Sequence, residues 1–139
     1  MRDRVVRVVL VVWAVASVQV GIWATFAPRS FFDDFPGFGR HWVRVYAPYN
    51  EHLVRDFGAL NLALAVVTIA ALVTLSRPMV IAVAIAWLVW GVPHLVYHLR
   101  HLDMLSSTGD KVANVLLLGS LPVLAVVVLA LTLRRPARA

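Results

Sequence analysis

The stretch VANVLLLGSLPVLAVVVLALTL, residues 112–133, decides the fold, because no charged side chain interrupts it. About 20 apolar residues in a helix cross a hydrocarbon core about 30 Å thick. Three further runs, at residues 5–26, 57–76 and 79–99, are also predominantly apolar. The chain is 61% hydrophobic and only 14% charged, with a mean hydropathy of +0.83, which excludes an ordinary soluble domain. We therefore predict an all-α fold, a bundle of four transmembrane helices that forms a single integral membrane domain over residues 1–139.

The positions of the cations predict how these spans are oriented. Lys and Arg near the ends of a span resist translocation and accumulate on the cytoplasmic side. One side of the membrane carries all of the formal net charge of +6. Its charged residues are Arg2, Arg4, Arg7, Arg77, Arg134, Arg135 and Arg138, with Asp3 as the acid among them. We expect a multi-pass protein of the cell membrane with both termini cytoplasmic and residues 28–50 extracytoplasmic.

The basic pI of about 11.1 follows from this topology and does not require nucleic-acid binding. Arginines at a cytoplasmic surface attract anionic lipids. We therefore expect membrane lipids as partners and no nucleic acid, and the small size fits a homo-oligomer or a subunit of a larger membrane complex. The chain has no cysteine, which excludes disulfides, thiolate nucleophiles and cysteine metal ligands.

Residues 28–50 form an aromatic loop between the first two spans. Its aromatic residues are Phe31, Phe32, Phe35, Phe38, Trp42, Tyr46 and Tyr49. Ser30 and Asp33 form a variant of the capping box that starts a short helix, which Pro36 and Gly37 would end. The rings favour a segment at the level of the lipid headgroups. A lid over a cavity between helix ends is the functional alternative.

The third span carries the densest set of polar side chains, in WLVWGVPHLVYHLRH at residues 87–101. At about 100° per residue, His94, His98 and His101 fall within about 40° of one another on a helix. Trp87 and Trp90 extend this stripe toward the middle of the bilayer, where they would line a pocket. His94 would lie about 10 Å below the end of the span. An imidazole at that depth needs a partner.

The start of the second span places further ionisable groups on the same side. Asn50 is suited to cap the helix that follows. His52 and Asp56 lie four residues apart on one face, as do Glu51 and Arg55. A short connection joins spans two and three, which predicts an antiparallel helical hairpin. The hairpin would bring these groups level with the third-span histidines, and converging intramembrane ionisable groups indicate a functional site.

Two interpretations of the site involve a cofactor. In the leading one, imidazoles and a carboxylate bind zinc, copper or iron, as in the metal sites of helical bundles. The metal ligands would be His52, His94, His98, His101 and Asp56. In the other, two histidines from facing helices hold a haem against Trp87 and Trp90.

Two further interpretations need no cofactor. Glu51 and Asp56 are candidate catalytic groups that would shuttle a proton on a lipid or sterol substrate, as in an isomerase. Alternatively, the ionisable groups are hydrogen-bonded pairs that fix helix register, and the protein is a structural or accessory subunit. Enzymatic activity is therefore left open by the sequence.

Weaker polar and small residues predict helix contacts. The amides expected to hydrogen-bond between helices are Gln19, Asn61 and Asn114. The small-residue pairs expected to permit close helix approach are Ala59 with Ala63 and Ala82 with Ala86.

The four short spans and the charged start of the second span, HLVRDFGALNLAL at residues 52–64, together resemble the DoxX-like small membrane proteins of bacteria. The Val, Ala and Arg usage is similar to that of actinobacterial proteins. The architecture is also similar to that of four-helix sterol isomerases of the emopamil-binding type, which have acids and aromatics around an intramembrane pocket. The stretch from Pro93 to His101 departs from both families, so neither resemblance implies catalytic residues here.

Overall fold

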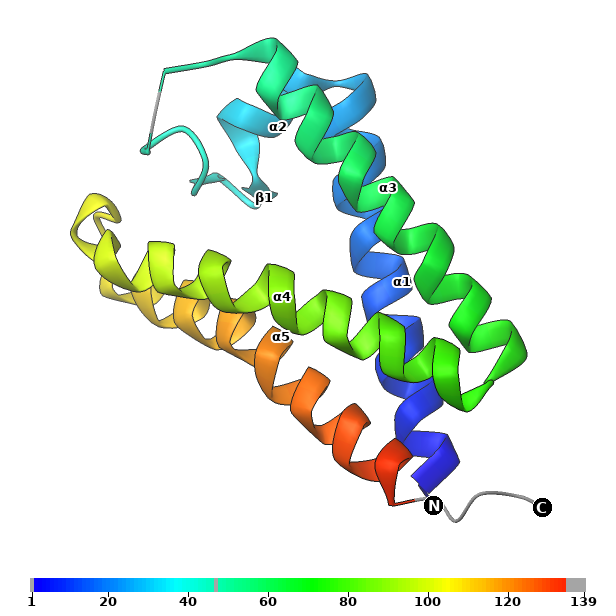
Figure 1. The fold of residues 1–139 in the computed structure, drawn as a ribbon. Coiled ribbons are helices and arrows are strands. Elements are labelled where there is room, and N and C mark those ends of the chain that lie inside the picture. Colours follow the sequence, from blue (N-terminus) through cyan, green and yellow to red (C-terminus); the bar gives the residue numbers. More distant parts are fainter. Residues whose placement is uncertain (1, 47, 135–139) are drawn as a thin grey trace. The chain divides into compact units, whose positions relative to one another are not determined.

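The computed structural model describes residues 2–46 and 48–134. In this part of the chain, four helices are long and apolar enough to cross a membrane (Figure 1). They are α1 (Arg2–Phe26), α3 (Glu51–Thr74), α4 (Arg77–Arg100) and α5 (Thr108–Leu133). The shorter elements are α2 (Pro28–Asp34), strands β1 (Pro36–Gly37) and β2 (Arg40–His41), and the single 3-10 turn η1 (Leu102–Met104). The predicted all-α class is confirmed, and the four apolar helices identify an integral membrane protein.

All four long helices begin before the predicted spans, and polar caps explain the two largest differences, at α3 and α5. Asn50 Oδ1 accepts a hydrogen bond from the Leu53 backbone N–H at 3.1 Å, so α3 begins at residue 51 and not at 57. Ser107 Oγ accepts from the Asp110 N–H at 2.9 Å, and α5 begins at residue 108 and not at 112. The hydropathy runs marked only the apolar parts of these helices. The cations Arg135 and Arg138, used to predict orientation, lie outside the described residues.

The N-cap of α3 supports a stability prediction. We expect Asn50→Ala to lower the free energy of unfolding by about 1 kcal/mol, because the Leu53 N–H loses its partner. Gln19→Ala, at an exposed position inside α1, is the matched control and should change little. Thermal unfolding in mild detergent, followed by circular dichroism at 222 nm, measures both. Equal melting temperatures for the two variants would contradict a capping role.

The chain divides into two compact units, and residues 13–66 form one of them. Within it, α1 and α3 approach closely at Gly58, where an added Cβ would lie 2.6 Å from the Thr25 backbone nitrogen. Arg55 donates from Nη1 to the carbonyl oxygen of Thr25 near the end of α1. Ala59 and Ala63 are exposed on α3 while Gly58 is buried, so the contact of α1 with α3 uses Gly58, and close approach at the two alanines stays a prediction.

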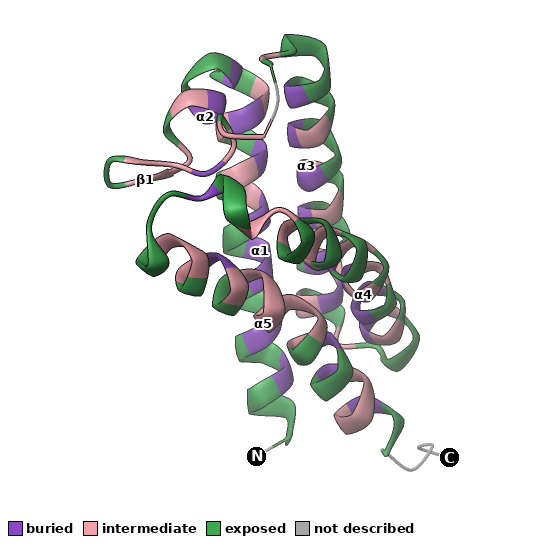
Figure 2. Cartoon of the chain, turned by 90° about the vertical axis from the view of Figure 1, so that its left-hand side faces the viewer, coloured by how far each residue is buried: buried purple, intermediate pink, exposed green. Residues whose placement is uncertain are grey.

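The loop of this unit packs through its aromatic rings. Phe31 and Phe32 of α2 are buried with Ala24 of α1 and Val54 of α3 (Figure 2). The short helix begins at Pro28 and not at Ser30, which corrects the predicted cap. Proline suits the first turn of a helix, where its missing N–H costs nothing. The helix ends before Pro36 as predicted, and a small antiparallel hairpin of β1 and β2 follows, which the sequence did not predict.

The other unit contains residues 67–134 of the described chain, together with the start of α1. Its α4 and α5 pack as a hairpin and touch at Gly91, where an added Cβ would lie 3.2 Å from the Leu121 Cβ. Trp87 Nε1 donates to the Thr68 hydroxyl at 3.2 Å, which joins α4 to the last turns of α3. Leu75, with φ of 48°, makes the turn into α4.

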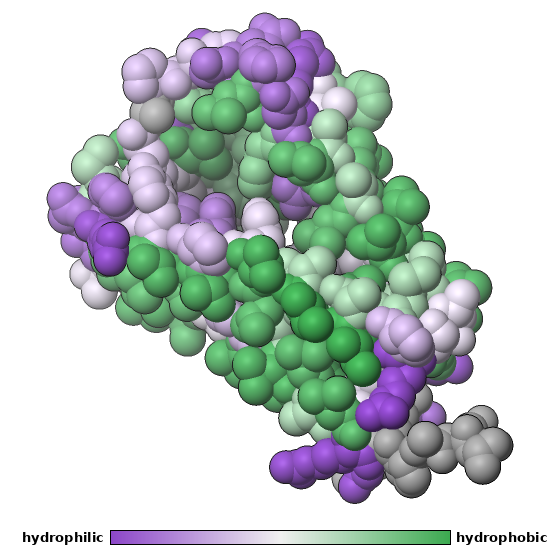
Figure 3. Space-filling view, viewed as in Figure 1, coloured by the Kyte–Doolittle hydropathy of each residue, from purple (hydrophilic) through white to green (hydrophobic). Residues whose placement is uncertain are grey.

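The outer faces of α4 and α5 are apolar. On the face seen in Figure 3, hydrophobic side chains cover most of these two helices. The large apolar side chains that are exposed include Val89, Leu116, Leu117 and Val123. Lipid tails are the solvent that suits such a surface, so contact with membrane lipids follows from the structure.

Candidate functional site

A row of aromatic rings follows one face of α4. The Trp87 and Trp90 ring centroids lie 5.5 Å apart, and Trp90 stacks on His94 at 4.9 Å with an interplanar angle of 17°. The His94 and His98 centroids are 4.8 Å apart. Residues three and four apart on a helix are surface neighbours, so the row follows directly from their spacing. The predicted stripe is therefore present from Trp87 to His98.

His101 lies at the end of this row, directly after the helix. Helix α4 ends at Arg100, and His101 adopts φ of −125° as the residue after it. Its ring stacks on Tyr97 at 4.3 Å, and its Nδ1 lies 2.7 Å from the Tyr97 carbonyl oxygen. His101 is nevertheless close enough to His98 to interact with it electrostatically. The stripe therefore reaches His101, although this last ring stacks on Tyr97 and not on His98.

Helix α5 supplies a polar neighbour of His98. Asn114 is only 1% exposed, and its side-chain amide lies close to the His98 imidazole. Its Oδ1 is buried without a hydrogen-bond partner among the described residues. This proximity of α5 to α4 is of the kind predicted for Asn114, and an interhelical hydrogen bond stays a prediction. Asn61 differs, because its Nδ2 donates to the Phe57 carbonyl of its own helix at 2.9 Å.

The ionisable groups of α3 form the predicted pairs within that helix. His52 Nε2 lies 3.2 Å from Asp56 Oδ2, and Arg55 Nε lies 2.9 Å from Glu51 Oε1. The His52 side chain is 86% exposed, and exposed pairs of this kind contribute well under about 1 kcal/mol. Both pairs belong to residues 13–66, whereas the α4 histidines belong to the other unit. Their convergence stays a prediction.

The aromatic segment is packed through several of its rings. The Phe31 centroid lies 4.9 Å from that of Phe35 and 5.9 Å from that of Phe57 on α3. Phe32 packs edge-on against Tyr49 at 5.3 Å. Desolvation and the neighbouring Glu51 carboxylate raise the pKa of Tyr49, because both disfavour the phenolate. These rings act as the core of the loop, and a lid role stays a prediction.

Among the described residues, the side chains that could bind a metal ion do not form a large cluster. Within residues 2–46 and 48–134, no group of three or more His, Cys, Asp or Glu side chains is placed to hold a metal ion. Asparagine oxygens are not among those groups, although they also bind metals. What the structure brings together is His94, His98 and the amide of Asn114.

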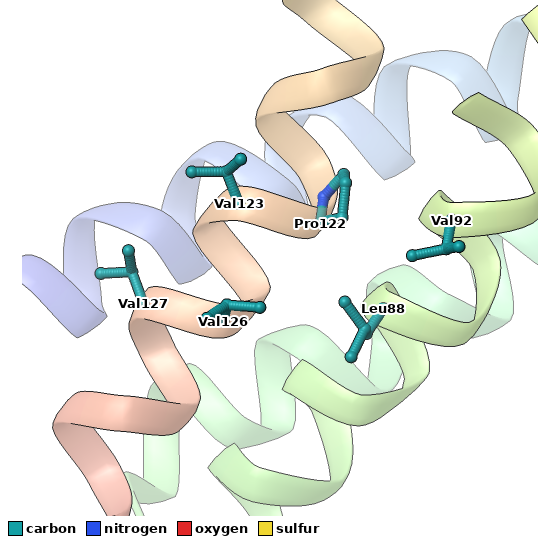
Figure 4. Close-up of a pocket in the computed structure, with 6 residues that line it drawn as sticks. All are labelled: Leu88, Val92, Pro122, Val123, Val126 and Val127. Atoms are coloured by element: carbon teal, nitrogen blue, oxygen red, sulfur yellow. The ribbon is translucent and has the colours of Figure 1, made fainter. Parts of the chain in front are cut away.

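An apolar groove of about 410 Å³ lies between α4 and α5 (Figure 4). Its lining residues are Leu88, Val92, Pro122, Val123, Val126 and Val127. None of these side chains can transfer a proton or bind a metal ion, so the groove has no chemistry of its own. Trp87 and Trp90, predicted to line a pocket, are not among its lining residues.

Comparison with known proteins identifies no relative, because no family model, curated protein or solved structure matches the chain. The chemistry of the site therefore depends on its own residues.

Proposed function

We propose that this integral membrane protein binds one copper or zinc ion between α4 and α5, through His94, His98 and Asn114. The main support for this proposal is the distance between the His94 and His98 rings. An ion held at about 2.0–2.1 Å by one nitrogen of each ring lies about 3 Å from each centroid. Rings at adjacent coordination positions then have centroids about 4.5–5 Å apart. The observed separation of 4.8 Å fits this arrangement after rotation of the rings about χ2.

Asn114 supports the proposal as a third donor. A buried oxygen without a partner costs about 1–3 kcal/mol, and Asn114 Oδ1 is such an oxygen among the described residues. The two ends of an amide exchange places by a rotation of 180°. That rotation would exchange the positions of Oδ1 and Nδ2, so that Oδ1 faces His98. A metal ion there would satisfy the carbonyl oxygen and both imidazoles together.

The geometry favours an ion over a haem held by this pair. Two axial imidazoles stand on opposite sides of a haem iron, which separates their centroids by about 6 Å at the same bond length. His94 and His98 are closer than that and lie on one face of one helix. Imidazole nitrogens without thiolates suit copper and zinc, and the chain has no cysteine. With three neutral donors, the ion would keep an open coordination position for water or an anion.

The site lies near one end of α4. His94 precedes the last residue of the helix, Arg100, by about 9 Å along its axis. The side of the predicted topology without net positive charge is extracytoplasmic, so we propose that the ion enters from outside the cell.

Substitution of Asn114 tests the proposed donor set. We expect Asn114→Leu to weaken copper and zinc binding about 10–100-fold, because the carbonyl donor is removed. Asn114→Asp should strengthen it, because the carboxylate supplies an anionic oxygen in nearly the same place. His52→Ala, which changes an imidazole of the exposed pair on α3, is the control. Calorimetric titration of the metal-stripped protein in detergent measures all of these affinities.

Equal affinity of wild type and Asn114→Leu would remove Asn114 from the ligand set. Failure of the wild-type protein to bind either ion would overturn the proposed function. A purely structural asparagine would lower stability in both Asn114 variants without any change that depends on metal.

A further inference from the structure

The tip of the β1–β2 hairpin presents one aromatic ring to its surroundings. Pro36 pairs with His41 and Gly37 with Arg40, which leaves Phe38 and Gly39 at the turn. Phe38 is 101% exposed and has φ of 58°. A non-glycine residue rarely adopts this left-handed conformation. The turn therefore holds a large apolar side chain away from the rest of its own unit.

The base of the hairpin is anchored. The Trp42 backbone N–H donates to the Phe35 carbonyl at 2.7 Å, and the Trp42 side chain is only 5% exposed. His41 Nδ1 lies within hydrogen-bonding distance of the Asp33 carbonyl oxygen. Figure 2 shows the hairpin extending to one side of α1 and α2. The exposure of Phe38 is thus a property of an ordered turn with a buried base.

The residues around Phe38 indicate which kind of surface its ring would contact. Arg40 follows two residues later, with its guanidinium 5.7 Å from the Trp42 ring centroid, and Arg44 is exposed. The hairpin is tethered on both sides to apolar helices, because α1 ends at residue 26 and α3 begins at residue 51. The surface of the membrane that these helices cross is therefore within reach. Aromatic and arginine side chains together are typical of segments that bind the lipid interface.

We propose that the β1–β2 hairpin is a membrane anchor whose Phe38 ring inserts among phospholipid headgroups, with Arg40 against a lipid phosphate. Apolar burial of the ring compensates the strained turn, and the guanidinium contributes charge-assisted hydrogen bonds to phosphate. This anchor is independent of the metal site. It would fix the orientation of the aromatic loop relative to the bilayer.

The absence of cysteine makes a single-label experiment direct. The full chain carrying Phe38→Cys is labelled with an environment-sensitive fluorophore and reconstituted into phosphatidylcholine vesicles containing phosphatidylglycerol. We expect blue-shifted emission, quenching by spin labels placed near the lipid headgroups, and protection from aqueous iodide. Asp34→Cys, at an exposed acidic position on α2, is the matched control and should be quenched by iodide.

Equal iodide quenching at the two positions would overturn the anchor. A Phe38 label shielded from both lipid spin labels and iodide would also overturn it, because the ring would then be covered by protein. Adding Arg40→Gln to the labelled chain should reduce quenching by the headgroup spin labels. If this second change left the quenching unaltered, a phosphate contact for Arg40 would be excluded.

Discussion

Simultaneous replacement of His94 and His98 by alanine is expected to lower copper and zinc affinity by more than about 100-fold, or about 2.7 kcal/mol of binding free energy. Both imidazoles are lost, and a single neutral oxygen from Asn114 cannot hold either ion without nitrogen donors beside it. Each single variant should retain weaker binding, because one imidazole and the amide remain. Calorimetric titration of the four proteins in the same detergent gives the coupling between the two histidines.

The double variant needs a control substitution that removes an imidazole outside the proposed metal site. His52→Ala removes an imidazole from the exposed pair on α3, and we expect it to alter the affinity far less than either α4 substitution. If the His94→Ala/His98→Ala protein bound copper as tightly as wild type, the ion would be held elsewhere. Circular dichroism of each variant establishes that the helices are retained.

Replacement of Gly58 by leucine is expected to prevent stable packing of α1 against α3. Even a single Cβ there would lie 2.6 Å from the Thr25 nitrogen and 2.9 Å from the Ala24 carbonyl carbon. Both are backbone atoms, so no side-chain rotation relieves the clash and a helix must move. We expect Gly58→Ala to cost about 1–3 kcal/mol and Gly58→Leu to abolish recovery of folded protein. Thermal unfolding in detergent and the yield of monodisperse protein measure the two effects.

Gly119 is the matched control, because an added Cβ there would meet no atom within 4 Å. Gly119→Ala also lies inside a helix, α5, and should stabilise it by up to about 1 kcal/mol through helix propensity. Opposite signs for the two Gly→Ala substitutions are therefore expected. A Gly58→Ala protein as stable as wild type would contradict the close contact of α1 and α3.

The helices were largely predictable from hydropathy, whereas their ends and contacts were not. Runs such as 112–133 contain no charged residue, and lipid is the solvent that suits them. The starts of α3 and α5 depend on Asn50 and Ser107, whose caps bring polar first turns into the helices. The helix contact at Gly58 depends on the register between α1 and α3, which composition does not specify. The hairpin at 36–41 was missed because Pro36 and Gly37 also mark the end of a helix.

The candidate site was predicted in part. The row from Trp87 to His98 follows from helical spacing alone. The stacking of His101 on Tyr97 was not predicted, because no proline or glycine marks the end of α4 at Arg100. Asn114 was expected to bond between helices, but its link to His98 depends on how α5 packs beside α4. Sequence spacing gives the faces of single helices, and only packing shows which faces meet.

Electron paramagnetic resonance of the copper-loaded protein in detergent tests the metal site most directly. We expect one Cu(II) per chain, with hyperfine coupling to the nitrogens of two imidazoles. We also expect coupling to one imidazole in His94→Ala and in His98→Ala, and no stoichiometric copper in the double variant. Copper below one equivalent in the wild type, or an identical copper signal in wild type and double variant, would contradict a metal site between α4 and α5.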